Sequence, residues 1–359
     1  MWVSQLAIDG LRCFRSASLL PCAGLNVLVG ANGAGKTTVL EALALLGSGR
    51  SFRGGARAPL IRSGFDAFSV FAQIESKRGV QNVGLSRTSL SWQAKVNGIA
   101  LGSLGQLVRE LPILVLEPDS HSLIEGPSES RRRLLDWLLF HVEPEFSAAA
   151  SRYQRALLQR NSVLKQEGLQ PGSLAVWNQQ LAETGTAVSS FRERQWGSLS
   201  PLICSALNQL LPELGEVNLC FNRGWSSDQS LLFDIEQRER VDIGRGFSSR
   251  GPHRSDWVLS FECAPERQWL SRGQEKSAYL AYAMAMLQRF SQCVGESAVL
   301  ALDDVWSELD ETHQDRCFGL AFESARQVWV SGTEQRSTRA AWPGDVRMFH
   351  VEQGRISVI

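Results

Sequence analysis

The residues best suited to chemistry lie in one glycine-rich stretch near the start of the chain, residues 30–37. The stretch fits G-x-x-x-x-G-K-[ST] at every fixed position. Glycine lets the backbone come close enough for its N–H groups to surround phosphate oxygens. In such a loop Lys36 reaches the β- and γ-phosphates of a nucleotide, and Thr37 is a ligand of Mg²⁺. The candidate nucleotide-binding residues are Gly30, Ala31, Asn32, Gly33, Ala34, Gly35, Lys36, Thr37 and Thr38.

The segments on either side of this loop are those that a phosphate-binding loop requires. Residues 25–29 form an unbroken apolar run, which predicts a buried strand. Residues 37–46 carry apolar side chains at helical spacing. A helix that starts at the loop adds unpaired N–H donors and the positive end of its dipole. The order strand, loop, helix therefore favours a nucleotide site over an incidental glycine-rich turn.

A second group of candidate residues follows an apolar strand at 299–302, where Asp303 and Asp304 stand side by side. This arrangement resembles a Walker B element. Asp303 would hold Mg²⁺ together with Thr37, and Asp304 would act as the catalytic base that orients the attacking water, with Lys36 as the second catalytic residue. Two aspartates after a strand can also simply cap a loop. The upstream phosphate loop favours the catalytic interpretation.

Composition limits the class of protein. The chain has 359 residues, 43% of them hydrophobic, and no formal net charge, so it can form a sizeable core but presents no overall basic field. Its seven cysteines include no C-x-x-C pair, which argues against a zinc site and fits a reducing cytosol. We see no signal peptide, and the apolar run at 278–287 is about half a membrane span. We expect a cytoplasmic protein with no membrane partner.

The remaining pattern predicts an α/β fold with an antiparallel β-subdomain and a helical insert. Further strands are expected at residues 2–8, 68–74, 80–85, 92–96, 112–116, 216–221, 257–261, 328–330 and 347–351. Helices are expected at 134–142, from 153 to about 168, at 177–191 and at 202–211. We expect a first ATPase lobe at 1–120, a helical arm at 121–240 and a second lobe at 241–359. The triplet 131–133 is all arginine, and it predicts either a phosphate contact or a solvated cluster.

A third motif precedes the apolar helix at 277–287. Ser271, Arg272, Gly273 and Gln274 resemble the signature loop of the ABC-type ATPases, and residues 307–310 resemble the D-loop that follows Walker B. In that superfamily the signature loop binds the γ-phosphate of ATP held by another subunit. The resemblance therefore implies an ATP-dependent homodimer that encloses two ATP molecules. The alternative is that Ser271 is an ordinary helix N-cap.

Within this superfamily the chain resembles the RecF family over nearly its whole length. The matching stretches are residues 48–53, 125–128 with Arg131 and Arg132, 158–161, 251–254, 271–276, 302–304 with 307–310, and 349–354. The chain departs from the family pattern at Ser255, where an acidic residue is expected, and at Thr38, where asparagine is common. Leu-Glu-Pro at 116–118 replaces Phe-Ser-Pro, so no Q-loop residue is assigned.

The resemblance implies a weak Mg²⁺-dependent, DNA-stimulated ATPase that acts as a switch in DNA repair, DNA replication and the SOS response. It implies binding to DNA at gap junctions between single strand and duplex, and cooperation with recombination mediator proteins such as RecR. His253 and Arg254 are expected to contact phosphate or another subunit, or else to form a buried turn, and Thr333 is a candidate γ-phosphate sensor. The alternatives are an SMC-like chromosome-organising ATPase, which needs a long coiled coil, and a transporter-energising subunit.

Overall fold

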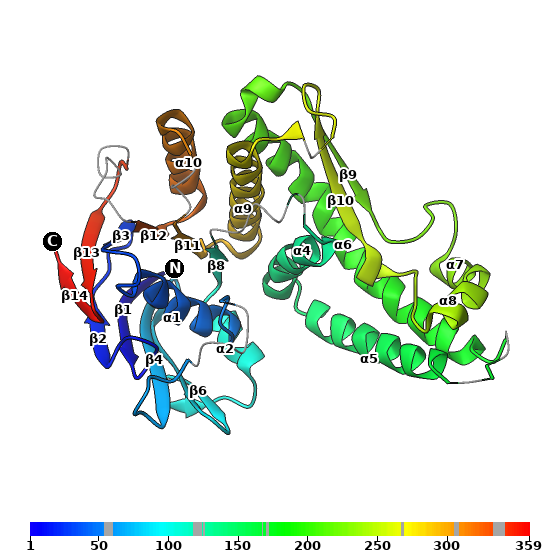
Figure 1. The fold of residues 1–359 in the computed structure, drawn as a ribbon, viewed down its shortest axis with the longest axis horizontal. Helices are drawn as coiled ribbons and strands as arrows, with labels where there is room; N and C mark the ends of the chain where they lie inside the picture. The colour runs from blue at the N-terminus through cyan, green and yellow to red at the C-terminus, as the bar shows by residue number, and fades with distance from the viewer. Residues whose placement is uncertain are drawn as a thin grey trace. The chain divides into compact units, whose positions relative to one another are not determined.

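The computed structural model describes residues 1–359 except 54–59, 118–123, 125, 167, 170–171, 267–268, 305–308 and 333–341. The chain divides into two compact units, the first made of Met1–His121 with Arg272–Ile359 and the second of Ser122–Ser271 (Figure 1). Residues 241–271, which the sequence analysis placed in the second lobe, lie in the second unit, where Asp256–Phe261 pairs with Val217–Asn222.

The first unit is built on a mixed sheet that carries the phosphate loop. Its strand order is β14-β13-β3-β12-β11-β8, and every neighbouring pair is parallel except β13 and β14. Its strands are β3 (Leu25–Val29), β8 (Ile113–Leu116), β11 (Val299–Asp303), β12 (Gln327–Gly332), β13 (Val346–Glu352) and β14 (Arg355–Val358). Because parallel strands all end at the same edge, the residues that follow β3, β11 and β12 come together there.

A second, antiparallel sheet accompanies the first. Its order is β2-β1-β4-β5-β6-β7, with β1 (Trp2–Asp9), β2 (Ser16–Leu19), β4 (Ala67–Ser76), β5 (Gly79–Thr88), β6 (Trp92–Val96) and β7 (Ile99–Ala100). Along β4 every second residue is buried, so one face of this sheet packs into the core while the other is more open.

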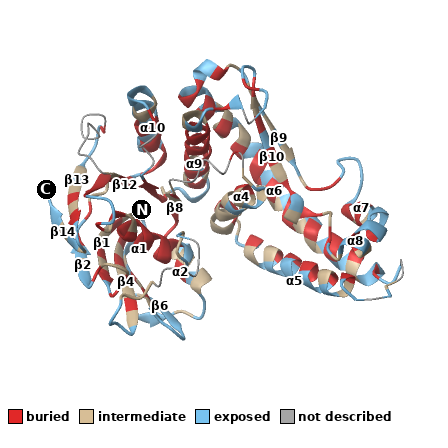
Figure 2. Cartoon of the chain, in the orientation of Figure 1, coloured by how far each residue is buried: buried red, intermediate tan, exposed pale blue. Residues whose placement is uncertain are grey.

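Helix α1 (Lys36–Ser48) joins the two sheets into one core. It contacts β4 and β5 of the antiparallel sheet and β8, β11 and β12 of the mixed sheet. Almost the whole helix is buried, as its colour in Figure 2 shows. The remaining helices of this unit are α2 (Leu104–Glu110), α9 (Arg272–Val294) and α10 (Glu311–Ser324), and α9 packs against α10. The phosphate loop is therefore held at both ends by buried elements.

The second unit is mainly helical. Among its described residues the helices are α4 (Ser128–Val142), α5 (Phe146–Leu164), α6 (Ala175–Leu210), α7 (Leu231–Gln237) and α8 (Glu239–Arg245), with short 3₁₀ turns η2 (Pro212–Leu214) and η3 (Pro252–Arg254). Strands β9 (Val217–Asn222) and β10 (Asp256–Phe261) form a two-stranded antiparallel sheet. Helices α5 and α6 pack along each other, and β9 contacts α6. Trp196 of α6 lies against Phe221 and Trp257 of this sheet.

The predicted helices at 177–191 and 202–211 are wrong as separate elements, because α6 runs through both and contains Pro201. Sequence patterns also did not predict β2, β7, β14, α2, α7, α8 or α10. Within the described residues, no helix is long and apolar enough to cross a membrane.

Candidate functional site

The phosphate loop lies between β3 and α1, as the sequence predicts. Gly35 has φ 117° and precedes the first residue of α1. A Cβ at Gly35 would lie 2.7 Å from the sulfur of Cys13, and one at Gly30 would lie 2.2 Å from the carbonyl oxygen of Val351. Both positions therefore favour glycine for lack of space and for their backbone conformations, since Gly30 has φ 155° and Gly35 has φ 117°. At Gly33, with φ 80°, a Cβ would meet nothing within 4 Å.

Lys36 extends back over this loop. Its ammonium donates hydrogen bonds to the carbonyl oxygens of Gly30 at 2.7 Å and Ala31 at 3.0 Å. Burial lowers the pKa of Lys36, while the carboxylates of Asp304 and Asp303 act in the opposite direction. The cation is thus held inside the curve of the loop, where the phosphates of a nucleotide would lie.

The structure brings the two predicted halves of the site together. The Thr37 hydroxyl donates to Asp303 Oδ1 at 3.0 Å. Asp303 is buried, and Asp304, one residue further, is exposed and has φ 47°. Residues 305–308, which include Ser307 and Glu308 of the predicted D-loop, lie outside the described residues, as does Thr333. Of the predicted D-loop, Asp310 caps α10 by accepting a hydrogen bond from the His313 backbone N–H at 2.8 Å.

These residues line one cleft of about 360 Å³ in the first unit. The lining combines the predicted residues with others that the sequence did not single out. It consists of Arg12, Cys13, Asn32, Gly33, Gly35, Lys36, Thr37, Thr38, Arg53, Asp303, Asp304 and Ser331. Three cationic side chains and the loop backbone face two carboxylates, which suits a polyphosphate together with a divalent cation.

Arg12 is a site residue that sequence analysis missed. It lies in the turn between β1 and β2 with φ 51°, and its guanidinium makes a two-pronged contact with Glu41 of α1 at 2.8 and 2.6 Å. Glu41 is fully buried, and its hydrogen bonds with Arg12 raise the pKa of that arginine. Glu41 also accepts a hydrogen bond from Ser51. No local motif marks Arg12, because its partner is distant in sequence.

The family-like ending of the chain also supports the loop. Gly354, in the turn between β13 and β14, donates its N–H to the carbonyl oxygen of Ala34 at 3.4 Å. A Cβ at Gly354 would lie 2.5 Å from the carbonyl oxygen of Cys13. The C-terminal hairpin therefore packs directly against the phosphate loop and the Arg12 turn.

The signature-loop candidates begin α9. Ser271 immediately precedes this helix, and Arg272, Gly273 and Gln274 form its first turn. Arg272, Gly273 and Gln274 belong to the same unit as the cleft but are not among the described residues that line it. In one chain, the cleft is therefore lined by phosphate-loop residues, Asp303 and Asp304, but not by the three signature-loop candidates.

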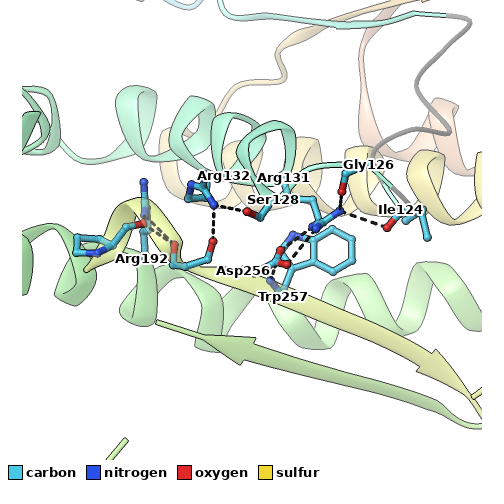
Figure 3. A network of polar contacts seen from close by, with 10 residues as sticks. Ile124, Gly126, Ser128, Arg131, Arg132, Arg192, Asp256 and Trp257 are labelled. Atoms are coloured by element: carbon cyan, nitrogen blue, oxygen red, sulfur yellow. Dashed lines mark hydrogen bonds and ion pairs between the residues drawn. The ribbon is translucent and has the colours of Figure 1, made fainter. Parts of the chain in front are cut away.

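Two of the three consecutive arginines in the second unit, Arg131 and Arg132, make polar contacts within the protein, as Figure 3 shows. Arg131 is buried and holds both carboxylate oxygens of Asp256, at 2.6 and 2.9 Å. Arg132 donates to Ser128 and to the carbonyl oxygen of Ser255. Only Arg133 is exposed, beside Glu129. The expectation of a solvated cluster is therefore wrong for Arg131 and Arg132, because folding supplies each with protein partners.

His253 is partly buried and lies in η3 between the buried Pro252 and the exposed Arg254. Its ring nitrogens lie 2.5 Å from the Tyr153 hydroxyl and 2.9 Å from the carbonyl oxygen of Ser248, and burial lowers its pKa to about 4. Arg254 is exposed, with its guanidinium over the ring of Phe247. At Ser255 the hydroxyl accepts from Arg192 at 2.8 Å, so it has a structural partner where the family pattern has an acid.

The side chains beside the phosphate loop have the donor chemistry of a divalent-cation site. The Thr37 hydroxyl and the Asp303 carboxylate are oxygen donors in contact, and Mg²⁺ is commonly held by one or two such groups together with water and substrate phosphates. No group of three or more His, Cys, Asp or Glu side chains suited to a metal occurs in the described part of the chain. The residues present fit a substrate-bound Mg²⁺ rather than a closed metal site.

Comparison with known proteins assigns the family. The model of the RecF/RecN/SMC N-terminal domain matches residues 2–357. A DNA replication and repair protein RecF of Xanthomonas euvesicatoria pv. vesicatoria (strain 85-10) is 42% identical over 364 residues, which cover 99% of this chain and 98% of that protein. The chain belongs to the RecF family. The RecF of Pseudomonas syringae pv. syringae (strain B728a) is 36% identical over 361 residues, with 99% and 98% coverage.

Solved structures share the fold. A structure of the recombination mediator protein RecF-ATP in the RecFOR pathway has a TM-score of 0.86 at 24% identity, covering 100% of this chain and 97% of that one. An Smc head domain with an extended coiled coil from Pyrococcus furiosus has a TM-score of 0.60 at 13% identity, covering 100% and 96%. The RecF-family chain therefore has the ABC-type ATPase head fold that the sequence predicts.

Proposed function

We propose that this RecF-family chain is an ATPase that uses ATP binding and hydrolysis as a switch for DNA binding in repair and replication. The observation that carries the proposal is the 3.0 Å contact between the Thr37 hydroxyl and Asp303, inside a cleft that also holds Lys36 and Asp304. The relatives are named DNA replication and repair proteins, and the RecF-ATP structure shares the fold, which supports the assignment.

Each residue has a distinct role in this proposal. Lys36 and the loop N–H groups bind the phosphates, and Thr37 with Asp303 would hold Mg²⁺. When bound, Mg²⁺ neutralises negative charge on the phosphate oxygens. Asp304, exposed at the mouth of the site, orients the attacking water and accepts its proton.

A second copy of the chain completes the site. Arg272, Gly273 and Gln274 would, with Ser271, contact the γ-phosphate held by a partner subunit, so ATP would join two chains.

The dimer would bind DNA at gap junctions through backbone phosphates without reading bases, and binding would weaken with salt. Recombination mediators such as RecR would then help to load a recombinase. Turnover is expected to be slow and stimulated by DNA, in the cytoplasm.

ATP turnover per subunit tests this proposal when it is measured against protein concentration, with and without gapped duplex DNA. We expect specific activity to rise with concentration and to rise further with DNA, because each site needs a second chain. Lys36→Met should abolish ATP binding. Lys95→Met, the same change at an exposed position of β6, should leave it intact. Turnover that is independent of both concentration and DNA would contradict the proposal.

A further inference from the structure

Ser331 lies beside the end of β11, next to Asp303 and Asp304. It is in β12, directly opposite Asp303 of β11 and Leu28 of β3 in the parallel register. Neighbouring residues in register point to the same face of a sheet, so the side chains of Ser331 and Asp303 lie together. Ser331 is buried, with 1% of its surface exposed, and it forms part of the cleft lining.

The Ser331 hydroxyl uses both of its hydrogen-bonding functions at this site. It donates to Asp303 Oδ1 at 2.6 Å and accepts from the backbone N–H of Asp304 at 3.0 Å. A serine hydroxyl has one hydrogen to donate and lone pairs to accept, so one oxygen atom serves both aspartates. Alanine can make neither contact, whereas threonine keeps the hydroxyl and adds one methyl group.

The contact with Asp303 fixes the direction of its carboxylate. Asp303 Oδ1 receives hydrogen bonds from Ser331 on one strand and from Thr37 of the phosphate loop. A carboxylate with one oxygen held by two donors from separate elements cannot rotate freely, so the direction of the second oxygen is fixed as well. Without Ser331, Thr37 alone would hold this oxygen.

The contact with Asp304 fixes a backbone conformation. Asp304 has φ 47°, a left-handed conformation that a non-glycine residue adopts only at some energetic cost. Such a conformation persists when surrounding contacts hold it. The Ser331 oxygen accepts a hydrogen bond from the backbone N–H of Asp304. It therefore helps to fix the direction in which the Asp304 side chain points.

We propose that Ser331 is the positioning residue of the hydrolytic site, which orients Asp303 through its donated hydrogen bond and Asp304 through its accepted one. The inference rests on the proposed ATPase function and assigns the residue that holds both acidic groups in place. Ser331 acts through these two residues and does not itself react.

The test compares Ser331→Ala with Ser331→Thr, which retains the hydroxyl. Ser324→Ala is the control, because Ser324 is an equally buried serine in α10 whose hydroxyl bonds to the carbonyl oxygen of Leu320. Three quantities are measured for the 359-residue chain. They are kcat for ATP, the Mg²⁺ concentration needed for half-maximal binding of a fluorescent ATP analogue, and the binding of that analogue without Mg²⁺. Circular dichroism checks folding.

For Ser331→Ala we expect kcat to fall by ~10- to 100-fold, as is usual when a group supporting a metal ligand is removed. The Mg²⁺ requirement should rise, and Mg²⁺-free nucleotide binding should stay within about twofold of the unaltered chain. Ser331→Thr should recover most of the activity, and Ser324→Ala should behave like the unaltered chain. Normal kcat and Mg²⁺ requirement in Ser331→Ala would overturn the inference, as would equal loss in Ser331→Thr.

If Ser331→Ala does not fold, Ser331→Cys replaces it, because a thiol keeps the volume but is a weak donor. Cysteine should then lose activity while threonine keeps it, and the reverse order would overturn the inference. These outcomes differ from failure of the proposed function, which would appear in the unaltered chain as no ATP turnover or as turnover that is independent of both protein concentration and DNA.

Discussion

The protonation of His253 follows from its two hydrogen-bond partners. The carbonyl oxygen of Ser248 can only accept, so the nitrogen facing it, Nε2, carries the hydrogen. A neutral imidazole then has Nδ1 as an acceptor, and the Tyr153 hydroxyl donates to it. Protonating Nδ1 would remove that acceptor inside a partly buried turn. This is consistent with a pKa lowered to about 4, for which burial is the main cause.

This shift predicts that acid destabilises the second unit through His253. In the unfolded chain His253 has a pKa of ~6.5, so between pH ~6.5 and ~4 the unfolded chain binds more protons than the folded one. His253 therefore stabilises the fold fully above that window, and its contribution falls by about 3 kcal/mol on acidification through it. Urea unfolding of His253→Gln and the unaltered chain at several pH values should show their stabilities converging as pH falls.

His350→Gln, a change in β13 of the first unit, is the control for this prediction and should not remove the pH dependence. A gap between the unaltered chain and His253→Gln that stays constant from pH 7 to pH 4 would show that His253 is not the group that titrates.

The residues that sequence analysis identified at the site are those marked by local spacing. Lys36, Thr37 and Asp303 each lie in a short motif, and folding places them in one cleft. Arg12 and Ser331 carry no such mark. Their roles come from partners far along the chain, Glu41 for one and the Asp303–Asp304 pair for the other. A single sequence does not show which distant residues will become neighbours, so such supporting residues appear only in the structure.

At the scale of elements, α6 shows how one helix can continue through a proline where the apolar spacing predicts two helices. Pro201 cannot donate the backbone hydrogen bond expected at its position, and its ring crowds the preceding turn. The buried face of α6 nevertheless continues beyond it, through Ile203, Leu207 and Leu210. Packing along that face outweighs the local loss, because most helix stability in proteins comes from tertiary contacts. Local pattern alone could not predict this outcome.

The arginines of α4 permit a matched test of what holds the second unit together. Arg131 is buried against Asp256, and it also donates to the carbonyl oxygens of Ile124 and Gly126 (Figure 3). Arg131→Ala should reduce the free energy of unfolding by about 3–5 kcal/mol, because it removes the cationic partner of a partly buried carboxylate together with the hydrogen bonds to two carbonyl oxygens. Denaturant unfolding measures this loss.

Arg133→Ala is the matched control, two residues further along the same helix. Arg133 and Glu129 are an exposed pair, with side chains 71% and 61% exposed, so its loss should change stability by no more than about 0.5 kcal/mol. An equal loss of unfolding free energy in the two variants would show that the buried ion pair between Arg131 and Asp256 is not what stabilises the second unit here.

At the scale of the whole molecule, the cleft and the first turn of α9 are separate parts of the chain that the proposed dimer would bring together across two copies. The phosphate loop and both Walker B aspartates face one cleft, whereas Arg272, Gly273 and Gln274 are not among its described lining residues. The chain has no formal net charge, so no overall electrostatic attraction or repulsion would control its self-association. ATP itself would then provide the link between two chains, and hydrolysis would remove it.

This mechanism predicts that blocking hydrolysis traps the dimer. Asp304→Asn keeps the size of the side chain but removes the carboxylate that accepts a proton, so ATP should bind without being consumed. Light scattering with Mg²⁺ and ATP should show a mass close to twice the 39.7 kDa of one chain, and with ADP the mass of a single chain. Lys36→Met should remain at the single-chain mass with either nucleotide. An Asp304→Asn protein that binds ATP yet stays monomeric at every concentration would mean that each chain acts alone.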